Sequence, residues 1–244
     1  MTFFSNFPVV QYKFGDEDTT DLFRNLSIYS TVVDQIKNEN SLYEDYQVIE
    51  NQRPDQVSYI LYDNPNFHWT FFLMNDNLRE QGWPLTNLEL LNFAKRKFPN
   101  KVLNTTSSLI SFPSFFKTGD TITGRSSGAT ATILRRDLDL GKLVISDITG
   151  TFVAGENIET SGTTELVTVS SVVDEHLSVH HYENNGVIVD VLSNGVPSPG
   201  ASDVEKTILD ELNNKNNELR RIRVIKSSMI NQIASSFKRA VGSE

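Results

Sequence analysis

The sequence predicts a multi-domain α+β protein, and three observations predict it. Residues 43–77 combine a short strand pattern with two helical patterns. Residues 106–182 are rich in glycine, threonine, serine, valine and isoleucine, and apolar residues alternate with polar ones as in β-strands. Residues 202–241 show two amphipathic helices on either side of a short strand. The 244 residues suffice for one large domain or two to three small ones.

These changes in composition divide the chain into four regions. We expect an extended N-terminal arm at 1–41 and an α+β module at 42–105. A small all-β domain at 106–182 and a linker with an α/β docking region at 183–244 follow. Helices are therefore expected in the second and fourth regions, and most strands in the third.

The N-terminal arm is rich in aromatic residues and has little to pack against. Its first apolar side chains are Phe3, Phe4, Phe7, Val9, Tyr12 and Phe14. An acidic patch follows at 15–18, and apolar residues recur from Leu22 to Ile36. Such a segment buries little surface by itself, so we expect it to pack on another domain or another chain.

The module at 42–105 is expected to begin with a strand and continue with helices. Tyr46 and Val48 follow the alternation of a strand. Pro54 then begins a helix, because proline is well tolerated at the first helical position. Asn64-Pro65 ends that helix, and the apolar stretch from Phe67 to Leu73 predicts a second one.

The all-β region contains an internal repeat. F-K-T-G-D-T-I at 116–122 matches F-V-A-G-E-N-I at 152–158, and a Ser-Gly pair follows each copy, at 127–128 and 161–162. Glycine in each turn supplies a backbone conformation that other residues adopt poorly. Two copies are too few for a solenoid, so the repeat predicts a small barrel or sandwich made of two similar halves.

The C-terminal region is expected to contain a helix, a strand and a helix after a linker at 193–200. Ser202-Asp203 is the expected cap of the first helix. R-R-I-R-V-I-K at 220–226 predicts a short basic strand, and Ser227-Ser228 is the expected cap of the last helix. The apolar stripe of that helix is either internal core or a partner-binding face. Its members are Met229, Ile230, Ile233, Phe237 and Val241.

Charge is unevenly distributed along the chain. The formal net charge is −9, but residues 215–241 hold seven basic side chains and one acidic one, which leaves about −15 for the rest. This basic end is either a docking surface for an acidic neighbour or a solvated helix face. A globally acidic protein is a poor general nucleic-acid binder. No apolar run approaches the roughly 18 residues that a membrane helix needs.

No residue pattern indicates catalysis, a metal or a cofactor. The chain has no cysteine, which excludes thiol catalysis and cysteine-based zinc sites. His180 and His181 would point to opposite faces of a strand, so His176 and Glu183 do not complete a zinc site with them. Adjacent carboxylates fit a solvated acidic surface better than a glycosidase pair. No G-x-S-x-G elbow or P-loop is present, so we expect no enzyme.

Two segments carry a family resemblance. The first is R-P-D-Q-V-S-Y-I-L-Y-D-N-P-N-F-H-W-T-F-F-L-M-N at 53–75 with W-P-L at 83–85, and the second is R-R-I-R-V-I-K-S-S-M-I-N-Q-I-A-S-S-F-K-R at 220–239. F-F-S-N-F-P at 3–8 and H-H-Y-E at 180–183 agree with them. Together they resemble the baseplate wedge protein 53 family of T-even-like contractile-tailed bacteriophages.

The resemblance implies a structural virion protein without a cofactor. Members of the family join the baseplate wedge and help neighbouring wedges associate around the central hub into a sixfold baseplate. The expected partners are therefore several wedge and tail proteins of the same phage, with no nucleic acid and no membrane. The expected location is the tail baseplate of the virion, after assembly in the host cytoplasm.

The module at 43–77 also resembles the LysM fold, in which a strand and a turn precede the first helix. Asn51-Gln52-Arg53-Pro54 replaces the Gly-Asp turn of LysM, and no closing apolar strand is evident after Asn77. We expect a LysM-like scaffold reused for protein contacts, with a peptidoglycan-binding tail adaptor as the alternative function. Tyr59, Tyr62, Phe67 and Trp69 fit core positions better than a sugar-stacking surface.

The two apolar ends of the chain are the expected contact sites for partners. The proposed interface residues are Phe3, Phe4, Phe7, Arg221, Ile222, Arg223, Val224, Ile225, Ile233 and Phe237. Neighbouring wedge proteins would be clamped between these ends.

Overall fold

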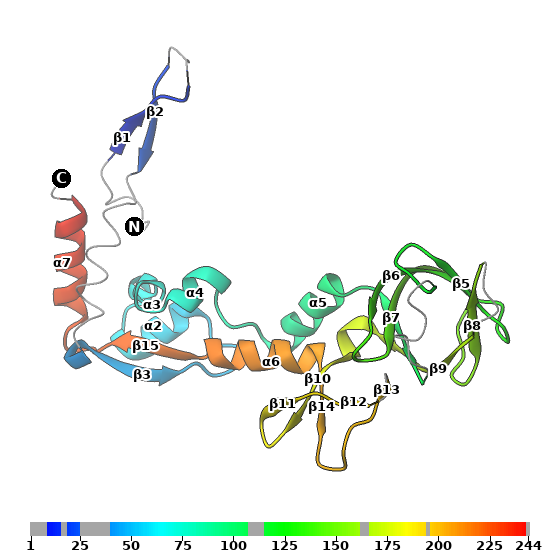
Figure 1. Cartoon of the computed structure of the whole chain (residues 1–244). Helices are drawn as coiled ribbons and strands as arrows, with labels where there is room; N and C mark the ends of the chain where they lie inside the picture. Colours follow the sequence, from blue (N-terminus) through cyan, green and yellow to red (C-terminus); the bar gives the residue numbers. More distant parts are fainter. Residues whose placement is uncertain are drawn as a thin grey trace. The chain divides into compact units, whose positions relative to one another are not determined.

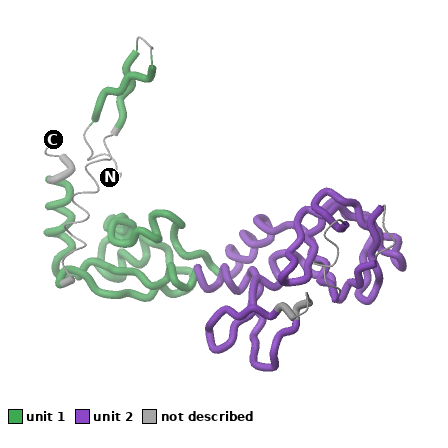
Figure 2. The backbone as a smooth tube through the Cα atoms, viewed as in Figure 1, with its two compact units in different colours: residues 1–86, 216–244 green, residues 87–215 purple. Residues whose placement is uncertain are grey.

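The computed structural model describes residues 9–15, 19–24, 40–106, 115–161, 166–193 and 196–242. It has mixed α and β structure and divides into two compact units. Unit 1 combines residues 1–86 with residues 216–244, and unit 2 comprises residues 87–215, as Figure 2 shows. The chain therefore leaves unit 1 to build unit 2 and then returns. The four-region division stays a prediction.

Within the predicted N-terminal arm, the described residues 9–15 and 19–24 form a β-hairpin. Strand β1 (Val9–Tyr12) pairs antiparallel with β2 (Asp21–Arg24) (Figure 1). Phe14 lies between Tyr12 and Phe23, with ring centroids 4.9 and 5.5 Å away in edge-to-face arrangements. The other half of the predicted arm, with Phe3, Phe4 and Phe7, lies outside the described residues.

The helical part of unit 1 follows the predicted order. A 3₁₀ turn, η2 (Asn40–Leu42), leads into β3 (Tyr43–Gln47), and helix α2 (Pro54–Tyr62) begins at the predicted proline. The Gln56 side chain accepts a hydrogen bond from Arg53 N at 2.9 Å, which satisfies a backbone donor at the helix start. Asp63 ends α2 with φ of 52°. The turn η3 (Pro65–Phe67), α3 (Trp69–Met74) and α4 (Asp76–Gln81) follow.

The strand that pairs with β3 comes from the far end of the chain. Strand β15 (Arg221–Ile225) runs antiparallel to β3, with Arg221 opposite Gln47 and Ile225 opposite Tyr43. Helices α6 (Ile208–Leu219) and α7 (Ile230–Gly242) flank it, as the helix–strand–helix prediction requires. The core on one side of this strand pair contains Val48, Val57, Phe71, Leu78, Leu219, Ile222 and Val224.

Unit 2 contains a closed six-stranded barrel, which confirms the barrel alternative for the all-β region. The strand order is β4 (Lys101–Thr105), β7 (Lys142–Thr149), β6 (Thr130–Asp137), β5 (Thr121–Gly124), β8 (Asn157–Thr160) and β9 (Val167–Asp174). Its core is built from buried apolar side chains, among them Leu103, Phe116, Ile122, Ile133, Leu143, Ile145 and Ile158.

The internal repeat appears in the barrel as a local twofold relation. Ile122 pairs with Thr160 and Gly124 pairs with Ile158, so β5 and β8 meet through equivalent positions 36 residues apart. The turns match as well. Gly119 N donates to Ile133 O, and Gly155 N donates to Val169 O, both at 2.8 Å. Because φ is 93° and 88° at these two glycines, both turns need glycine.

A small three-stranded sheet and helix α5 (Asn87–Lys97) also belong to unit 2. Helix α5 precedes the barrel, and the turn η5 (Glu175–Leu177) follows it. Strand β10 (Val179–Asn184) then pairs with β11 (Val187–Val189) on one side and β14 (Val204–Thr207) on the other.

Two details of the expected linker and helix cap are corrected. The short strands β12 (Leu192–Ser193) and β13 (Val196–Pro197) pair inside the expected linker at 193–200. Strand β14 also separates Ser202-Asp203 from helix α6. Thr207 therefore caps the helix instead, because its hydroxyl accepts from Asp210 N at 3.1 Å while Asp210 accepts from Thr207 N at 2.9 Å.

Candidate functional site

The proposed interface residues of β15 divide into two faces. Ile222 and Val224 are buried in the core of unit 1, whereas Arg221 and Arg223, which alternate with them along the strand, are exposed. The alternation follows from the period of two in a strand. The Arg223 guanidinium carbon lies 5.0 Å from the centre of the Tyr43 ring, in cation–π geometry. A partner on this face would meet arginines rather than the aliphatic residues.

The apolar stripe of α7 packs within the chain itself. Ile225, Ile230 and Ile233 form one core cluster with Met74. Phe237 is buried, and its ring centroid lies 5.0 Å from that of Trp69. Of the two alternatives for this stripe, the structure favours internal core at the described positions. Lys238 and Arg239 on the same helix remain exposed.

Two surfaces of unit 1 are therefore available to partners. The first, called the basic face, is the set of exposed basic side chains formed by Arg221 and Arg223 on β15 and Lys238 and Arg239 on α7. The second, called the apolar hairpin, comprises the β1–β2 hairpin with Val9, Val10, Tyr12, Phe14, Leu22 and Phe23, whose exposed fractions lie between 40% and 67%. Isolated exposed apolar residues are common, but six in one hairpin indicate an interaction surface.

Two asparagines hold the returning chain in place, and the sequence analysis missed both. Asn75 Nδ2 donates to Arg223 O and Asn75 Oδ1 accepts from Arg223 N, each at 2.8 Å. Asn216 Oδ1 accepts from Leu85 N at 2.8 Å, and its Nδ2 donates to Leu85 O at 2.9 Å. Each amide thus pairs with a backbone N–H and C=O as a neighbouring strand would. Asn75 follows the apolar run F-F-L-M at 71–74, but Asn216 lies in the polar run N-N-K-N-N at 213–217 and has no distinctive sequence signal.

The histidine cluster differs from the prediction. The register of β10 shifts between Val179 and His181, and the two histidine rings contact each other with centroids 5.1 Å apart, so the expectation of opposite faces was wrong. His180 Nδ1 lies 2.8 Å from His181 Nδ1, and His181 Nε2 lies 3.0 Å from Glu183 Oε1. Burial and the neighbouring His181 lower the pKa of His180. Within the described ranges, no three metal-ligating side chains converge.

The other buried polar groups have structural partners. Tyr62 Oη donates to Ile225 O at 2.8 Å, and burial raises the pKa of this phenol. Lys142 Nζ donates to Val179 O, and burial lowers the pKa of Lys142. Tyr62, Phe67 and Trp69 are partly buried, whereas Tyr59 is exposed. Among the described helices, none is long and apolar enough to cross a membrane.

Comparison with known proteins identifies the N-terminal part of the chain. Residues 5–91 match the family model described as base plate wedge protein 53. The match confirms the resemblance drawn from residues 53–75, and it indicates a structural protein of the phage baseplate wedge. It ends before the second resembling segment at 220–239. A search of curated proteins found no match.

Proposed function

We propose that this baseplate wedge protein is a clamp that joins different neighbours during assembly of a contractile tail. The apolar hairpin would bind one neighbour, and the basic face would bind another. The observation that carries the proposal is that all described residues of 9–15 and 19–23 are exposed, in a strand pair with six large apolar side chains.

The apolar hairpin is suited to contact with a partner. An isolated two-stranded hairpin is marginally stable in water, because it cannot bury enough apolar surface. A partner that covers Tyr12, Phe14 and Phe23 would supply that burial. Hairpin strands can also extend the sheet of a partner through their free backbone edges.

The basic face supplies a different kind of contact. Arg221 and Arg223 lie on a strand that is held from behind by Ile222 and Val224, so the arginines are presented from a rigid element. Arginine pairs with carboxylates through two parallel hydrogen bonds, which favours an acidic partner surface. The rest of the chain carries most of the negative charge, so it would be repelled by the same acidic partner.

Two weak contacts in one molecule are sufficient for a clamp. Once one surface is bound, the other is held at a high effective concentration near its own partner. Sixfold repetition around a hub would multiply the effect. On this proposal the partners are other wedge and tail proteins, and assembly takes place in the host cytoplasm without nucleic acid.

Cross-linking mass spectrometry on intact phage particles tests the clamp. We expect Lys13 in the hairpin and Lys238 on α7 to cross-link to different baseplate proteins. Particles assembled with Arg221→Glu and Arg223→Glu should lose the Lys238 cross-links and keep those of Lys13. Cross-links from both lysines to one and the same neighbour would refute a bridging role.

A second candidate function is peptidoglycan binding through the LysM-like module. It is favoured by β3, α2 and α3, which follow the strand–helix–helix order of that fold, and by the pairing of β3 with the distant strand β15. A hollow of about 510 Å³ lined by exposed Tyr59 and Ile60 also favours it. Trp83 Nε1 donates to Gln52 O at 2.7 Å, and Gln52 lines the hollow. Titration with murein or chitin fragments should therefore change tryptophan fluorescence, and a flat response rejects this function.

A further inference from the structure

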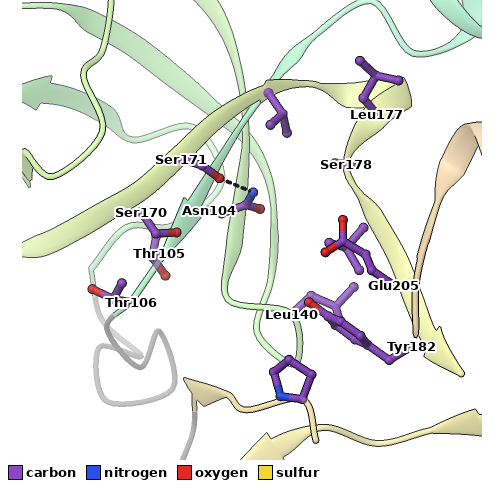
Figure 3. A pocket seen from close by; sticks show the side chains of 13 residues that line it. Asn104, Thr105, Thr106, Leu140, Ser170, Ser171, Leu177, Ser178, Tyr182 and Glu205 are labelled. Atoms are coloured by element: carbon purple, nitrogen blue, oxygen red, sulfur yellow. Dashed lines mark hydrogen bonds between the residues drawn. The ribbon is translucent and has the colours of Figure 1, made fainter. Parts of the chain in front are cut away.

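A second cavity lies in unit 2, outside both surfaces of the proposed clamp. It has a volume of about 380 Å³ and lies between the outside of the barrel and the small sheet (Figure 3). Asn104 of β4 and Ser170 and Ser171 of β9 line the barrel side. Tyr182 of β10 and Glu205 of β14 line the sheet side. The volume falls within the range of small-molecule sites.

The polar groups of this cavity are only partly paired. Asn104 Nδ2 donates to Ser171 Oγ at 2.8 Å, which fixes that pair against the barrel. Tyr182 and Glu205 are direct cross-strand neighbours, so both side chains lie on one face of the sheet. Burial and the negative charge of Glu205 raise the pKa of Tyr182. Among the described residues, the Ser170 and Tyr182 hydroxyls and the Glu205 carboxylate make no hydrogen bond, so they are free for a ligand.

The lining excludes several ligand classes. It contains no lysine, arginine or histidine and has one carboxylate, Glu205. Phosphates, nucleotides and acidic sugars would therefore meet a negative charge without a positive one to offset it. Lipid chains fit poorly, because hydroxyl, amide and carboxylate groups line the cavity together with its apolar residues, which are Leu140, Val173, Leu177, Val179 and Pro199.

We propose that this cavity binds a saccharide unit that is neutral or carries an amino group. Sugar hydroxyls would donate to the Glu205 carboxylate and exchange hydrogen bonds with Ser170 and Tyr182. The apolar side chain of Leu140 would cover the C–H face of the ring. Charge-assisted hydrogen bonds are the stronger ones, so Glu205 is expected to dominate affinity. The inference does not depend on the clamp.

Chemical-shift mapping on the full chain tests the proposal. We expect N-acetylglucosamine, glucosamine or chitotriose, titrated up to about 20 mM, to shift amide signals of 104–106, 170–171 and 204–206. Glucuronic acid and glucose 6-phosphate should produce no shifts there. Shifts confined to residues around Tyr59 would place the sugar in the other hollow and overturn the proposal.

Matched variants separate binding from folding. Glu205→Gln and Tyr182→Ala should each weaken saccharide binding about tenfold or more, since each removes a hydrogen-bonding group from the site. Glu218→Gln makes the same charge change on α6, outside the cavity, and should bind as the wild type does. Ile188→Thr changes an exposed residue of the same sheet and controls for sheet integrity. Equal affinity of wild type and both cavity variants would overturn the assignment, as would no binding of any neutral or amino sugar by the wild type.

Discussion

At the scale of single residues, Asn75 shows how a side chain replaces a strand. It is 7% exposed and lies between α3 and α4, where its amide pairs with the backbone of Arg223 and also donates to Phe71 O at 2.8 Å. Without the amide, the N–H and C=O of Arg223 would lose their partners in a partly buried environment. Such groups are costly because water cannot replace the lost hydrogen bonds.

We predict that Asn75→Ala lowers the free energy of unfolding of unit 1 by about 2–3 kcal/mol. Urea denaturation monitored by tryptophan fluorescence measures this free energy, because Trp69 and Trp83 both belong to unit 1. Asn66→Ala, at an exposed position of η3, is the control and should change stability little. An unchanged midpoint for Asn75→Ala would mean that β15 does not need this side chain.

Glu156 has a comparable role in the barrel. Its carboxylate accepts from Val153 N at 2.6 Å and from Ser127 N at 3.0 Å, and it is 4% exposed. Burial alone would raise the pKa of this carboxyl, but the hydrogen bonds from Val153, Ser127 and Ser126 outweigh burial and lower it. The ionised form is therefore the one that stabilises the fold.

A pH dependence follows from the lowered pKa of Glu156. The stabilisation of the folded state by the ionised Glu156 carboxylate is fully present above the unfolded pKa of about 4.3. It is lost as the pH falls through the folded pKa. We predict that Glu156→Gln costs about 1–3 kcal/mol at pH 7 and that the difference from wild type shrinks steadily below about pH 4. Thermal unfolding across this pH range checks it, with Glu159→Gln at an exposed ion pair as the control. A difference that does not change with pH would contradict the assignment.

Sequence alone could predict residues whose role depends on near neighbours. Pro54 at a helix start and Gly119 in a turn belong to this group, because local sterics decide both. Asn75, Asn216 and Glu156 could not be predicted in the same way. In the sequence, Asn75 lies 148 residues from its partner Arg223, Asn216 lies 131 from Leu85, and Glu156 lies 29 from Ser127. A polar residue gives no periodic signal of such pairing.

At the scale of elements, β15 is the strand that closes the α+β module. No closing strand is evident in the sequence after Asn77, and the strand is instead supplied by residues 221–225. Both strands were predicted, but their pairing was not, because hydrophobic alternation shows which face is buried and not which strand lies alongside. The barrel was more predictable, since its two repeats pair with each other through equivalent residues.

We predict that Ile222→Ala destabilises unit 1 by about 2–4 kcal/mol, since it removes a buried aliphatic side chain from the core between β15 and the helices. Chemical denaturation measures the loss. Ile188→Ala, at an exposed strand position, should stay close to wild type. Comparable losses for both variants would show that β15 is not a central part of the core.

At the scale of the whole molecule, unit 2 is an insertion in unit 1. The chain leaves unit 1 after residue 86 and re-enters it at residue 216, and Asn216 bonds to the backbone of Leu85 at the crossing point. Entry and exit points that lie close together are typical of inserted domains, because the host fold then needs no rearrangement. The distant pairing of β3 with β15 follows from the same insertion and adds a long loop that folding must close.

This topology predicts that unit 1 folds without unit 2. Helix α6 rises about 1.5 Å per residue, so Ile208 lies about 12 Å along the helix from Asn216, and a Gly-Ser linker of about six to eight residues can join residue 86 to Ile208. The chain 1–86, linker, 208–244 should unfold cooperatively with the fluorescence transition of Trp69 and Trp83. A matched chain that ends at residue 219 should fail to fold, because it lacks β15 and leaves Val57 and Phe71 uncovered. If instead both chains melt without cooperativity, the barrel is required for unit 1 and the insertion description falls. If both fold, the α+β module closes without its returning strand, and the clamp would have to present its arginines from some element other than a core strand.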